Sequence, residues 1–318
     1  MAGEPRRRGA DPARVSLSEL LALGRPAASL ALGGRQLPGA APPGGFVSPL
    51  RGRGMEFEES RPYSPGDDVR HLDWRATARS GRAHTKIFRQ ERERPVFVWL
   101  DLRAAMRFAT CGAYKAVLAC RMAALLMWVA LRHGDRLGAV VFADDGHREF
   151  RPRRGRLAVL HLLRYLAGHP IWRGGRRYTA VVPEAASDAL ERLSRVVRPG
   201  SLLFLLSDFR GLDEGAARSC LASLSGHCEI FLVFFFDRLE CELPPPGRYR
   251  ISDGRQRMAL HVAGEAMAAD HRRRFAARRK RLQDLAYRYR LRLLECRTDA
   301  DPLIVLQRGL GRRPLFRR

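Results

Sequence analysis

Lysine and acidic residues are scarce in this chain of 318 residues. Of the 58 basic residues only three are lysines, Lys86, Lys115 and Lys280, and the 33 acidic residues leave a formal net charge of +25. Such a charge attracts phosphate backbones and anionic lipids over long distances. The arginines are spread from Arg6 to Arg318 without a nucleic-acid-binding motif, so a bias towards arginine codons explains them equally well. We therefore do not expect nucleic acid to be the functional partner.

Paired cysteines and membrane-length apolar segments are also absent. The six cysteines form no C-x-x-C pair, which argues against both a zinc site and a disulfide framework. The longest apolar stretch, Ala116 to Leu131, is interrupted by Arg121 and is shorter than the roughly 20 residues that span a bilayer. No clean hydrophobic block with a cleavage site stands near the N-terminus. These absences predict a cytoplasmic protein without a transmembrane segment.

The motifs of common enzyme active sites are missing as well. There is no G-x-S-x-G nucleophile elbow. The glycines Gly309 and Gly311 follow an expected helix and lack the Lys-Ser/Thr of a phosphate-binding loop. The sequence therefore predicts a protein that is not an enzyme, with no catalytic residues and no cofactor.

Apolar runs alternate with helical segments from residue 95 onward. The runs show no polar alternation, which is typical of strands covered on both faces. The expected strands are 96–101, 138–142, 201–207, 229–236 and 291–296, and the expected helices are 112–133, 156–168, 183–197, 213–225 and 264–289. Strand-like segments also occur near 248–262. This alternation predicts an α/β fold with a doubly wound, mostly parallel sheet.

Three regions are expected along the chain. Residues 1–44 form an N-terminal extension with a short helix, which a capping box of Ser16 and Glu19 begins. Residues 45–94 alternate charged and apolar residues around turn signals, which predicts a small β-rich module of short strands and ordered loops. Residues 95–311 form the α/β domain.

Two carboxylates follow expected strands, Asp101 after the first and Asp208 after 201–207. In doubly wound sheets, ligands bind outside the carboxyl ends of the strands. Two carboxylates that meet there can hold a hard divalent cation through oxygen ligands, provided that hydroxyl groups from the connecting loop help.

The stretch before the first buried strand resembles the signature of a known family. The matching segments are Arg51–Phe57, Arg61–Asp68, Arg70–Arg75, Thr77–Arg79, Lys86–Phe88, Glu91–Pro95 and Gly138–Phe142. The motifs Pro-Gly-Asp-Asp, Asp-Trp and Ala-Arg follow one another at a long and unusual spacing. In this spacing the chain resembles the bacterial domain-of-unknown-function family 58. The resemblance implies a von Willebrand factor A-like fold without enzymatic activity. It also implies a MoxR-type AAA+ ATPase as partner in assembling or activating other proteins.

The von Willebrand A-like fold further implies a metal-ion-dependent adhesion site. That site has the pattern Asp-x-Ser-x-Ser after the first strand, a Thr in a later loop and an Asp after a later strand. Here the first element runs from Asp101 through Arg103 to Ala105, so both hydroxyl ligands are missing. Thr179 and Asp208 are candidates for the later positions. We expect Arg103 to pair with Asp101 or Asp208 and to replace the cation, which predicts a degenerate site without metal.

The signature residues are a second candidate site, for binding a partner. They are Arg61, Tyr63, Gly66, Asp67, Asp68, Arg70, Asp73, Trp74 and Arg79. The favoured interpretation is structural, because Pro and Gly preset a turn and Asp caps backbone amides. In this interpretation Asp73 and Trp74 lock the module against the sheet. The alternative is a direct contact surface. His71 resembles a metal ligand, but no further histidine stands at a suitable spacing.

Two alternatives to an interaction protein stay open. The first is a polyanion binder that uses the arginines of 270–290. Against it, one face of that helix has apolar residues at helical spacing and is expected to pack on the sheet, which makes the arginines a solvated face. The apolar residues are Phe275, Leu282, Leu285 and Tyr289. The second alternative is a metal-dependent hydrolase that uses Asp101, Asp208 and His71.

Overall fold

The computed structural model describes residues 11–32, 55–64, 67, 69–90, 94–173, 183–210, 215–252 and 257–311. The chain divides into two compact units. The larger unit consists of Met1–Arg35 and Arg94–Arg318, and the smaller unit, Gln36–Glu93, is inserted between these two segments of sequence.

A six-stranded sheet forms the centre of the larger unit, with the order β10-β7-β6-β3-β4-β5. The strands are β3 (Val96–Asp101), β4 (Leu137–Ala143), β5 (Gly146–Arg153), β6 (Leu202–Ser207), β7 (Glu229–Phe236) and β10 (Arg292–Arg297). All neighbours are parallel except β5, which is antiparallel to β4. Numbered within this sheet, the strands have the 3-2-1-4-5-6 order of a doubly wound fold, whose switch point lies between β3 and β6.

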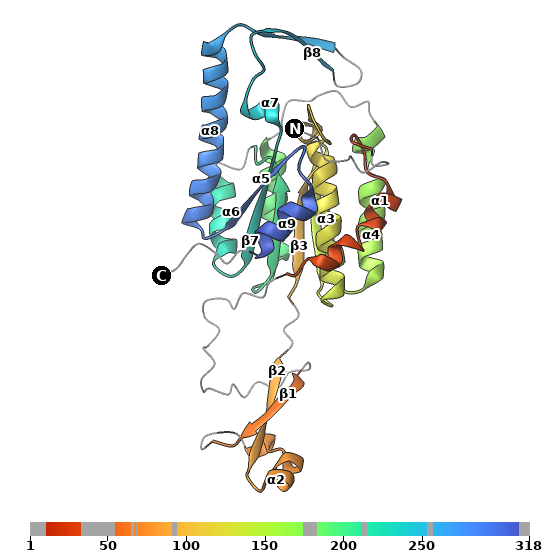
Figure 1. The fold of residues 1–318 in the computed structure, drawn as a ribbon, viewed down its shortest axis with the longest axis vertical. Helices are drawn as coiled ribbons and strands as arrows, with labels where there is room; N and C mark the ends of the chain where they lie inside the picture. Colours follow the sequence, from red (N-terminus) through yellow and green to blue (C-terminus); the bar gives the residue numbers. More distant parts are fainter. Residues whose placement is uncertain are drawn as a thin grey trace, which may run out of the picture. The chain divides into compact units, whose positions relative to one another are not determined.

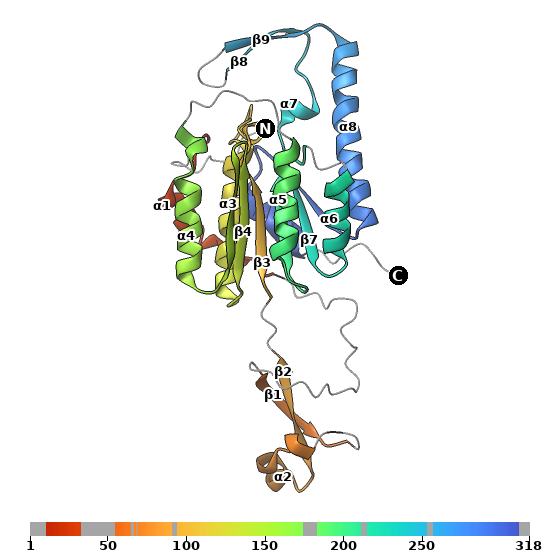
Figure 2. The same cartoon turned by 180° about the vertical axis from the view of Figure 1, so that it is seen from behind.

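Helices cover both faces of this sheet (Figures 1 and 2). Along β3, Val96, Val98 and Leu100 belong to one core, and Phe97 and Trp99 belong to the other. The first core lies against α3 (Lys115–Arg132), α4 (Arg156–Ala167) and α9 (Pro302–Gly311), and the second lies against α5 (Pro183–Val196), α6 (Gly215–Ser225) and α8 (Glu265–Arg288). The predicted doubly wound, mostly parallel α/β sheet is confirmed.

The edge strand β5 is an addition to the predicted elements. It forms a tight hairpin with β4 through Asp144 and Asp145, and its side chains are exposed or half-buried. An edge strand that faces solvent carries charged residues, so it lacks the continuous apolar run that identifies the inner strands.

The segment between β7 and β10 leaves the sheet and returns. The short helix α7 (Arg238–Cys241) leads to the two-stranded sheet of β8 (Gly247–Ser252) and β9 (Arg257–Val262), and α8 then runs back. The predicted packing of the apolar face of α8 is confirmed: Leu282 is buried in the second core, and Phe275, Leu285 and Tyr289 lie against it.

The described part of the N-terminal extension packs into the larger unit. It contains α1 (Leu17–Ala22) and the 3₁₀ helix η1 (Pro26–Ser29), and its buried side chains Val15, Leu20 and Leu30 belong to the first core. Ser16 caps α1 by accepting the N–H of Glu19 at 3.2 Å. At the other end of the segment, Gln307 of α9 donates to Ser29 at 2.9 Å.

The smaller unit consists of the antiparallel hairpin β1 (Met55–Pro62) and β2 (His84–Gln90) with two short helices between its strands. These are the 3₁₀ helix η2 (Val69–His71) and α2 (Trp74–Ser80). The sequence analysis expects short strands and ordered loops here, so α2 is a correction. Its start and stop are both present in the sequence, since Asp73 is its N-cap and Gly81, with φ of 68°, ends it.

Candidate functional site

Carboxylates stand at the carboxyl ends of four neighbouring strands in the larger unit. Asp101 ends β3, and Asp144, Asp208 and Asp237 directly follow β4, β6 and β7. The sequence analysis identifies Asp101 and Asp208, which flank the switch point between β3 and β6. It misses Asp144 and Asp237, although the same position after a buried strand marks both.

Asp101 forms a two-pronged ion pair with Arg103, and both side chains are fully buried. Nε of Arg103 donates to Oδ1 of Asp101 at 3.0 Å, and Nη2 donates to Oδ2 at 2.6 Å. Oδ1 also accepts the backbone N–H of Arg103 at 2.9 Å, and Oδ2 accepts the hydroxyl of Ser207 at 2.6 Å. The expected pairing of Arg103 with Asp101 is therefore present, and each carboxylate oxygen accepts two hydrogen bonds.

Arg103 has further partners across the switch point. Its Nη2 donates to the carbonyl oxygen of Arg210 at 3.1 Å and lies 3.9 Å from Oδ1 of Asp208. Its guanidinium carbon lies 5.3 Å from the centre of the Phe142 ring, within the range of a cation–π interaction. Burial alone would lower the pKa of Arg103, but Asp101 above all, and then Asp208, raise it above its usual value. Arg103 is therefore a permanent cation at this point.

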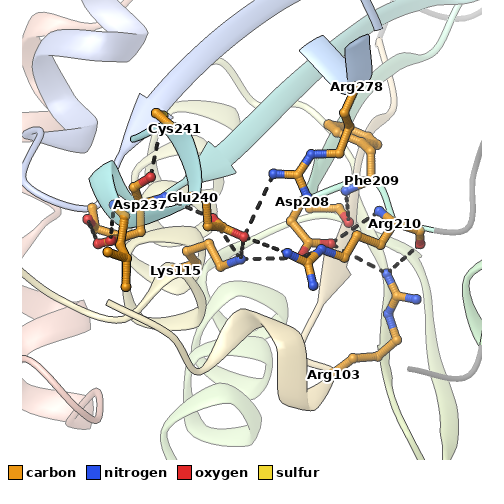
Figure 3. Close-up of polar contacts among 12 residues, drawn as sticks. Arg103, Lys115, Asp208, Phe209, Arg210, Asp237, Glu240, Cys241 and Arg278 are labelled. Carbon is orange, nitrogen blue, oxygen red and sulfur yellow. Dashed lines mark hydrogen bonds and ion pairs between the residues drawn. The ribbon is translucent and has the colours of Figure 1, made fainter. Parts of the chain in front are cut away.

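Asp208 and Glu240 are the acidic members of a second set of ion pairs, in which Lys115 and Arg210 are the basic members (Figure 3). Lys115, the first residue of α3, is buried, and its Nζ lies 3.2 Å both from Oδ2 of Asp208 and from Oε1 of Glu240. Arg210 donates to the same oxygen of Glu240 at 2.8 Å and lies 3.5 Å from Asp208. Glu240 also accepts the N–H of Asp237 at 2.9 Å in the capping box of α7.

We call Asp101, Arg103, Lys115, Asp208, Arg210 and Glu240 the edge cluster. It joins β3, β6, α3 and α7 through three carboxylates and three cations of the chain itself. Sequence reasoning misses Lys115, Arg210 and Glu240. The available signal is Lys115, one of only three lysines, which stands within an apolar helix.

The cluster controls the ionisation of Asp208. Burial alone would raise the pKa of this carboxyl, but the charge of Lys115, followed by those of Arg210 and Arg103, lowers it from 3.8 to about 2. A carboxyl whose pKa is lower in the folded chain stabilises the fold above its unfolded pKa. The stabilisation is lost as the pH falls through the folded value.

The contribution of Asp208 to stability is expected to disappear between pH 4 and pH 2. The difference between the unfolded and the folded pKa of Asp208 corresponds to about 2 kcal/mol of unfolding free energy. The measurement is urea unfolding of wild type and Asp208→Asn at several pH values, because the difference between the two isolates this carboxyl from all others. The stability advantage of wild type should shrink as the pH falls over this interval. A constant difference would show that the ion pairs do not stabilise the charged form.

The edge cluster does not fit the divalent cation of an adhesion site. Arg103 stands where the pattern has its first serine, and both oxygens of Asp101 are already bound. Ala105, at the position of the second serine, offers no side-chain oxygen and lies in the short helix η3 (Ala104–Met106). Thr179 lies outside the described residues. The positive charges of Arg103 and Lys115 would in addition repel a dication.

A pocket of about 470 Å³ opens beside the edge cluster. Its apolar lining comes from the loop after β3, from α7 and its following residues, from β9 and from α8, and consists of Phe108, Leu239, Leu243, Leu260 and Met267. Charged and polar groups complete it, namely Glu240, Asp270, His271 and Arg274. Apolar walls with a few polar groups are typical of pockets that bind a ligand.

The signature residues lie in the smaller unit, and several of them hold its turns. Nη2 of Arg61 donates to Oδ1 of Asp67 at 2.7 Å, and Oδ2 of Asp67 accepts the N–H of Ser64 at 2.9 Å. The N–H of Tyr63 donates to the carbonyl of Ala83 at 2.8 Å, which closes the end of the hairpin. Gly66, Asp68 and the side chain of His71 lie outside the described residues.

The other signature residues cluster around α2. Asp73 caps the helix, while Arg70, Trp74 and Arg79 are exposed. The prediction that Asp73 and Trp74 lock the module against the sheet stays a prediction, because the structure describes each unit by itself. The structure therefore yields two candidate sites, the edge cluster with its pocket and the signature surface.

Similar proteins of two mycobacteria are described as uncharacterized. Uncharacterized proteins of Mycobacterium bovis and Mycobacterium tuberculosis are 28% identical over 271 residues, which is 85% of this chain and 83% of theirs. Among solved structures, a von Willebrand factor type A protein from Catenulispora acidiphila is 13% identical and has a TM-score of 0.39, with 72% of this chain and 45% of that chain covered. The structure itself shows the doubly wound, mostly parallel sheet, and the von Willebrand A-like class stays a prediction.

The prediction of a cytoplasmic location is wrong by the same comparisons. One similar structure is described as an aerotolerance-related membrane protein from Bacteroides fragilis, with 15% identity, a TM-score of 0.33, and 61% of this chain and 99% of that chain covered. Another is described as an uncharacterized membrane-spanning protein from Vibrio fischeri, with 17% identity, a TM-score of 0.21, and 61% and 96% covered. Among the described residues, no helix has both the length and the apolar character needed to cross a bilayer.

The match to a protein family covers both candidate sites. It extends over residues 59–284, from β1 to α8, and so includes Asp73, Trp74 and the whole edge cluster. The description of that family is a protein of unknown function, in agreement with the resemblance that the signature spacing indicates. The chain belongs to the DUF58 family.

Proposed function

We propose that this protein is a non-enzymatic interaction protein that works with a MoxR-type AAA+ ATPase in assembling or activating other proteins. The observation that carries the proposal is the edge cluster. At the carboxyl ends of the strands, where doubly wound folds bind ligands, basic side chains of the protein itself fill the site. Arg103 binds Asp101 there, and Lys115 binds Asp208. This edge is held in one geometry by side chains alone, so it can present a fixed surface without binding a divalent ion.

The same pairs argue against the metal-dependent hydrolase. Asp101 and Asp208 are the carboxylates that such an enzyme would need, and both are fully buried and bound to cations of the chain. A general base or metal ligand needs an oxygen that is accessible to substrate or metal. We therefore propose that the protein binds no divalent cation at this edge and has no catalytic residues there.

The pocket beside the cluster supplies a contact point. Met267 on α8 lines the pocket and is 40% exposed, and Glu240 connects the pocket directly to the ion pairs. Interfaces concentrate their binding energy in a few apolar anchors that fill pockets, surrounded by polar contacts. A large apolar side chain of the ATPase that enters this pocket would meet that description.

Pull-down of the tagged protein from its own cell extract, after nuclease treatment, is expected to recover the ATPase at both low and high salt. Apolar contacts survive salt, whereas binding through phosphates weakens steeply. Met267→Asp puts a charge into the apolar lining and should reduce recovery of the ATPase at least tenfold. A loss of about 1.4 kcal/mol in binding free energy lowers affinity tenfold. The matched control is Leu157→Asp on α4, where the side chain is 82% exposed and away from the pocket lining.

The polyanion-binding alternative predicts the opposite outcome. Nucleic acid would be recovered at low salt, would wash off with salt, and no ATPase would accompany it. Several arginines of α8 already have acidic partners within the chain: Arg272 pairs with Glu265, Arg273 with Asp270 and Arg279 with Glu295. These pairs agree with a solvated helix face. Recovery of salt-sensitive nucleic acid without the ATPase would favour the alternative.

A further inference from the structure

An exposed tryptophan stands at the start of α2 in the smaller unit. The side chain of Trp74 is 72% exposed, and Val69 in η2 is 62% exposed. Tryptophan is highly buried on average in folded proteins, and Trp99 of the same chain is fully buried. Within the smaller unit, the described residues leave the side chains of Trp74 and Val69 uncovered, and an exposed apolar patch with a polar border is a candidate interaction site.

The position of Trp74 is fixed by the residue before it. Oδ1 of Asp73 accepts the N–H groups of Arg75 and Ala76, both at 3.1 Å, and Oδ2 accepts the hydroxyl of Ser60 on β1 at 2.6 Å. The N–H of Asp73 donates to the carbonyl of His84 on β2 at 2.8 Å. Asp73 thus ties the first turn of α2 to both strands of the hairpin, and Trp74 is the first residue of that turn.

Two further signature residues, Arg61 and Asp67, hold the turn beside this helix. Arg61 and Asp67 pair at 2.7 Å between the end of β1 and the turn that precedes η2. Their charges are therefore used within the unit, whereas the described residues of the unit leave the side chain of Trp74 exposed. A group that is held rigidly in solvent loses little conformational entropy when a partner covers it, which favours binding.

The charge around Trp74 indicates the chemistry of the partner. Between residues 69 and 84 there are four arginines, Arg70, Arg75, Arg79 and Arg82, all of them exposed, and Asp73 is the only acidic residue. Complementary surfaces pair opposite charges. The partner surface must therefore be acidic and must offer an apolar recess for the indole ring.

A protein fits this surface better than a nucleic acid or a membrane does. Single-stranded nucleic acids stack successive bases on several aromatic rings, and Trp74 is the only Phe, Tyr or Trp between residues 69 and 84. A helix that lies in a membrane interface presents a long apolar face, whereas α2 has only seven residues. Trp and Arg are also the residues most enriched among the strong contributors to protein interfaces.

We infer that Trp74, Val69 and the arginines of α2 form a docking surface for an acidic protein surface with an apolar recess. This inference rests on the proposed function, since it gives the interaction protein a second contact, on the smaller unit. It develops the contact-surface alternative for the signature residues, and the tests below separate it from the locking interpretation.

The first test separates the two interpretations of Trp74. Trp74→Ala in the full chain is expected to leave the thermal unfolding midpoint unchanged within about 2 °C, because an exposed side chain contributes little to stability. It is expected to weaken binding of the protein that crosslinks to position 74 at least about 30-fold, as a loss of about 2 kcal/mol at an interface does. Trp74→Phe should restore part of the binding. A large fall in the unfolding midpoint would show that Trp74 packs within the chain and would overturn the inference.

The second test identifies what covers Trp74. A photo-crosslinking phenylalanine derivative at position 74 of the full chain is irradiated in the protein's own cells, with the same group at position 157 as control. Crosslinks to a protein segment with Asp and Glu around an apolar residue, lost in Arg75→Glu/Arg79→Glu, support the inference. Crosslinks to nucleic acid, to lipid or within the chain, or none at all, overturn it.

The outcomes for the two proposals remain distinct. If the pull-down recovers the ATPase but position 74 gives no such crosslink, the docking surface is wrong and the proposed function stands. If position 74 crosslinks to an acidic segment of a protein that is not an ATPase, the docking surface stands and the proposed partner is wrong.

Discussion

Replacing Arg103 by methionine is expected to lower the free energy of unfolding by about 3–5 kcal/mol. Methionine keeps much of the side-chain volume but removes the guanidinium that binds both oxygens of Asp101. Asp101 then stays buried as a charge without its cation, because Ser207 and a backbone N–H supply only neutral hydrogen bonds. Urea unfolding at neutral pH measures the loss.

Two further variants test the cause of this loss. Arg279→Met removes a two-pronged pair with Glu295 that is partly exposed, and it is expected to cost less than about 1 kcal/mol. Asp101→Asn combined with Arg103→Met removes the stranded charge and should recover part of the stability. If Arg103→Met costs no more than Arg279→Met, the buried ion pair of Arg103 with Asp101 does not stabilise the larger unit more than an exposed pair does.

Replacing Gly112 by alanine is expected to destabilise the larger unit by about 3 kcal/mol or more. Gly112 has φ of 78°, and a Cβ there would lie 2.0 Å from the carbonyl oxygen of Thr298. That oxygen accepts the N–H of Ala113 at 3.0 Å, so it cannot move without loss of a hydrogen bond. Thermal or urea unfolding of the variant measures the effect.

Gly134→Ala is the matched control for this prediction. Gly134 has a similar φ of 70°, but a Cβ added there would have as its nearest neighbour the flexible end of Arg154, at 3.9 Å. Alanine at position 134 therefore shows only the cost of placing a non-glycine residue in the left-handed conformation, which is about 1 kcal/mol. Equal losses in the two variants would show that the close approach of Gly112 to Thr298 does not matter.

The fold was predictable because burial leaves a continuous pattern. The runs at β3, β6 and β7 are apolar on nearly every residue since helices cover both faces, and each run identifies its strand to within a residue or so. β5 lies at an edge and faces solvent, so its sequence reads as charged loop. In the smaller unit, α2 was missed because seven residues are too few to show helical periodicity, although its caps were visible.

The candidate site was only half predictable, because its members come from distant segments. Asp101 and Asp208 follow strands, so a position rule identifies them. Lys115 and Glu240 depend on how α3 and α7 approach that edge. The apolar helix around Lys115 marks that residue, whereas Glu240 does not differ in sequence from a solvated charge. Their ion pairs join residues 93 and 125 positions apart, and no local pattern encodes such a contact.

The insertion of the smaller unit has a consequence for the order of events on the ribosome. Val15, Leu20 and Leu30 leave the ribosome before the rest of the core that buries them, which includes residues of α3 and α4 and, later in the chain, Cys296 and Leu306. The hairpin of the smaller unit needs only contacts between neighbouring segments and can form meanwhile. Until α3 and α4 have been synthesised, the N-terminal segment therefore presents an uncovered apolar strip, which is the kind of sequence that nascent-chain chaperones hold.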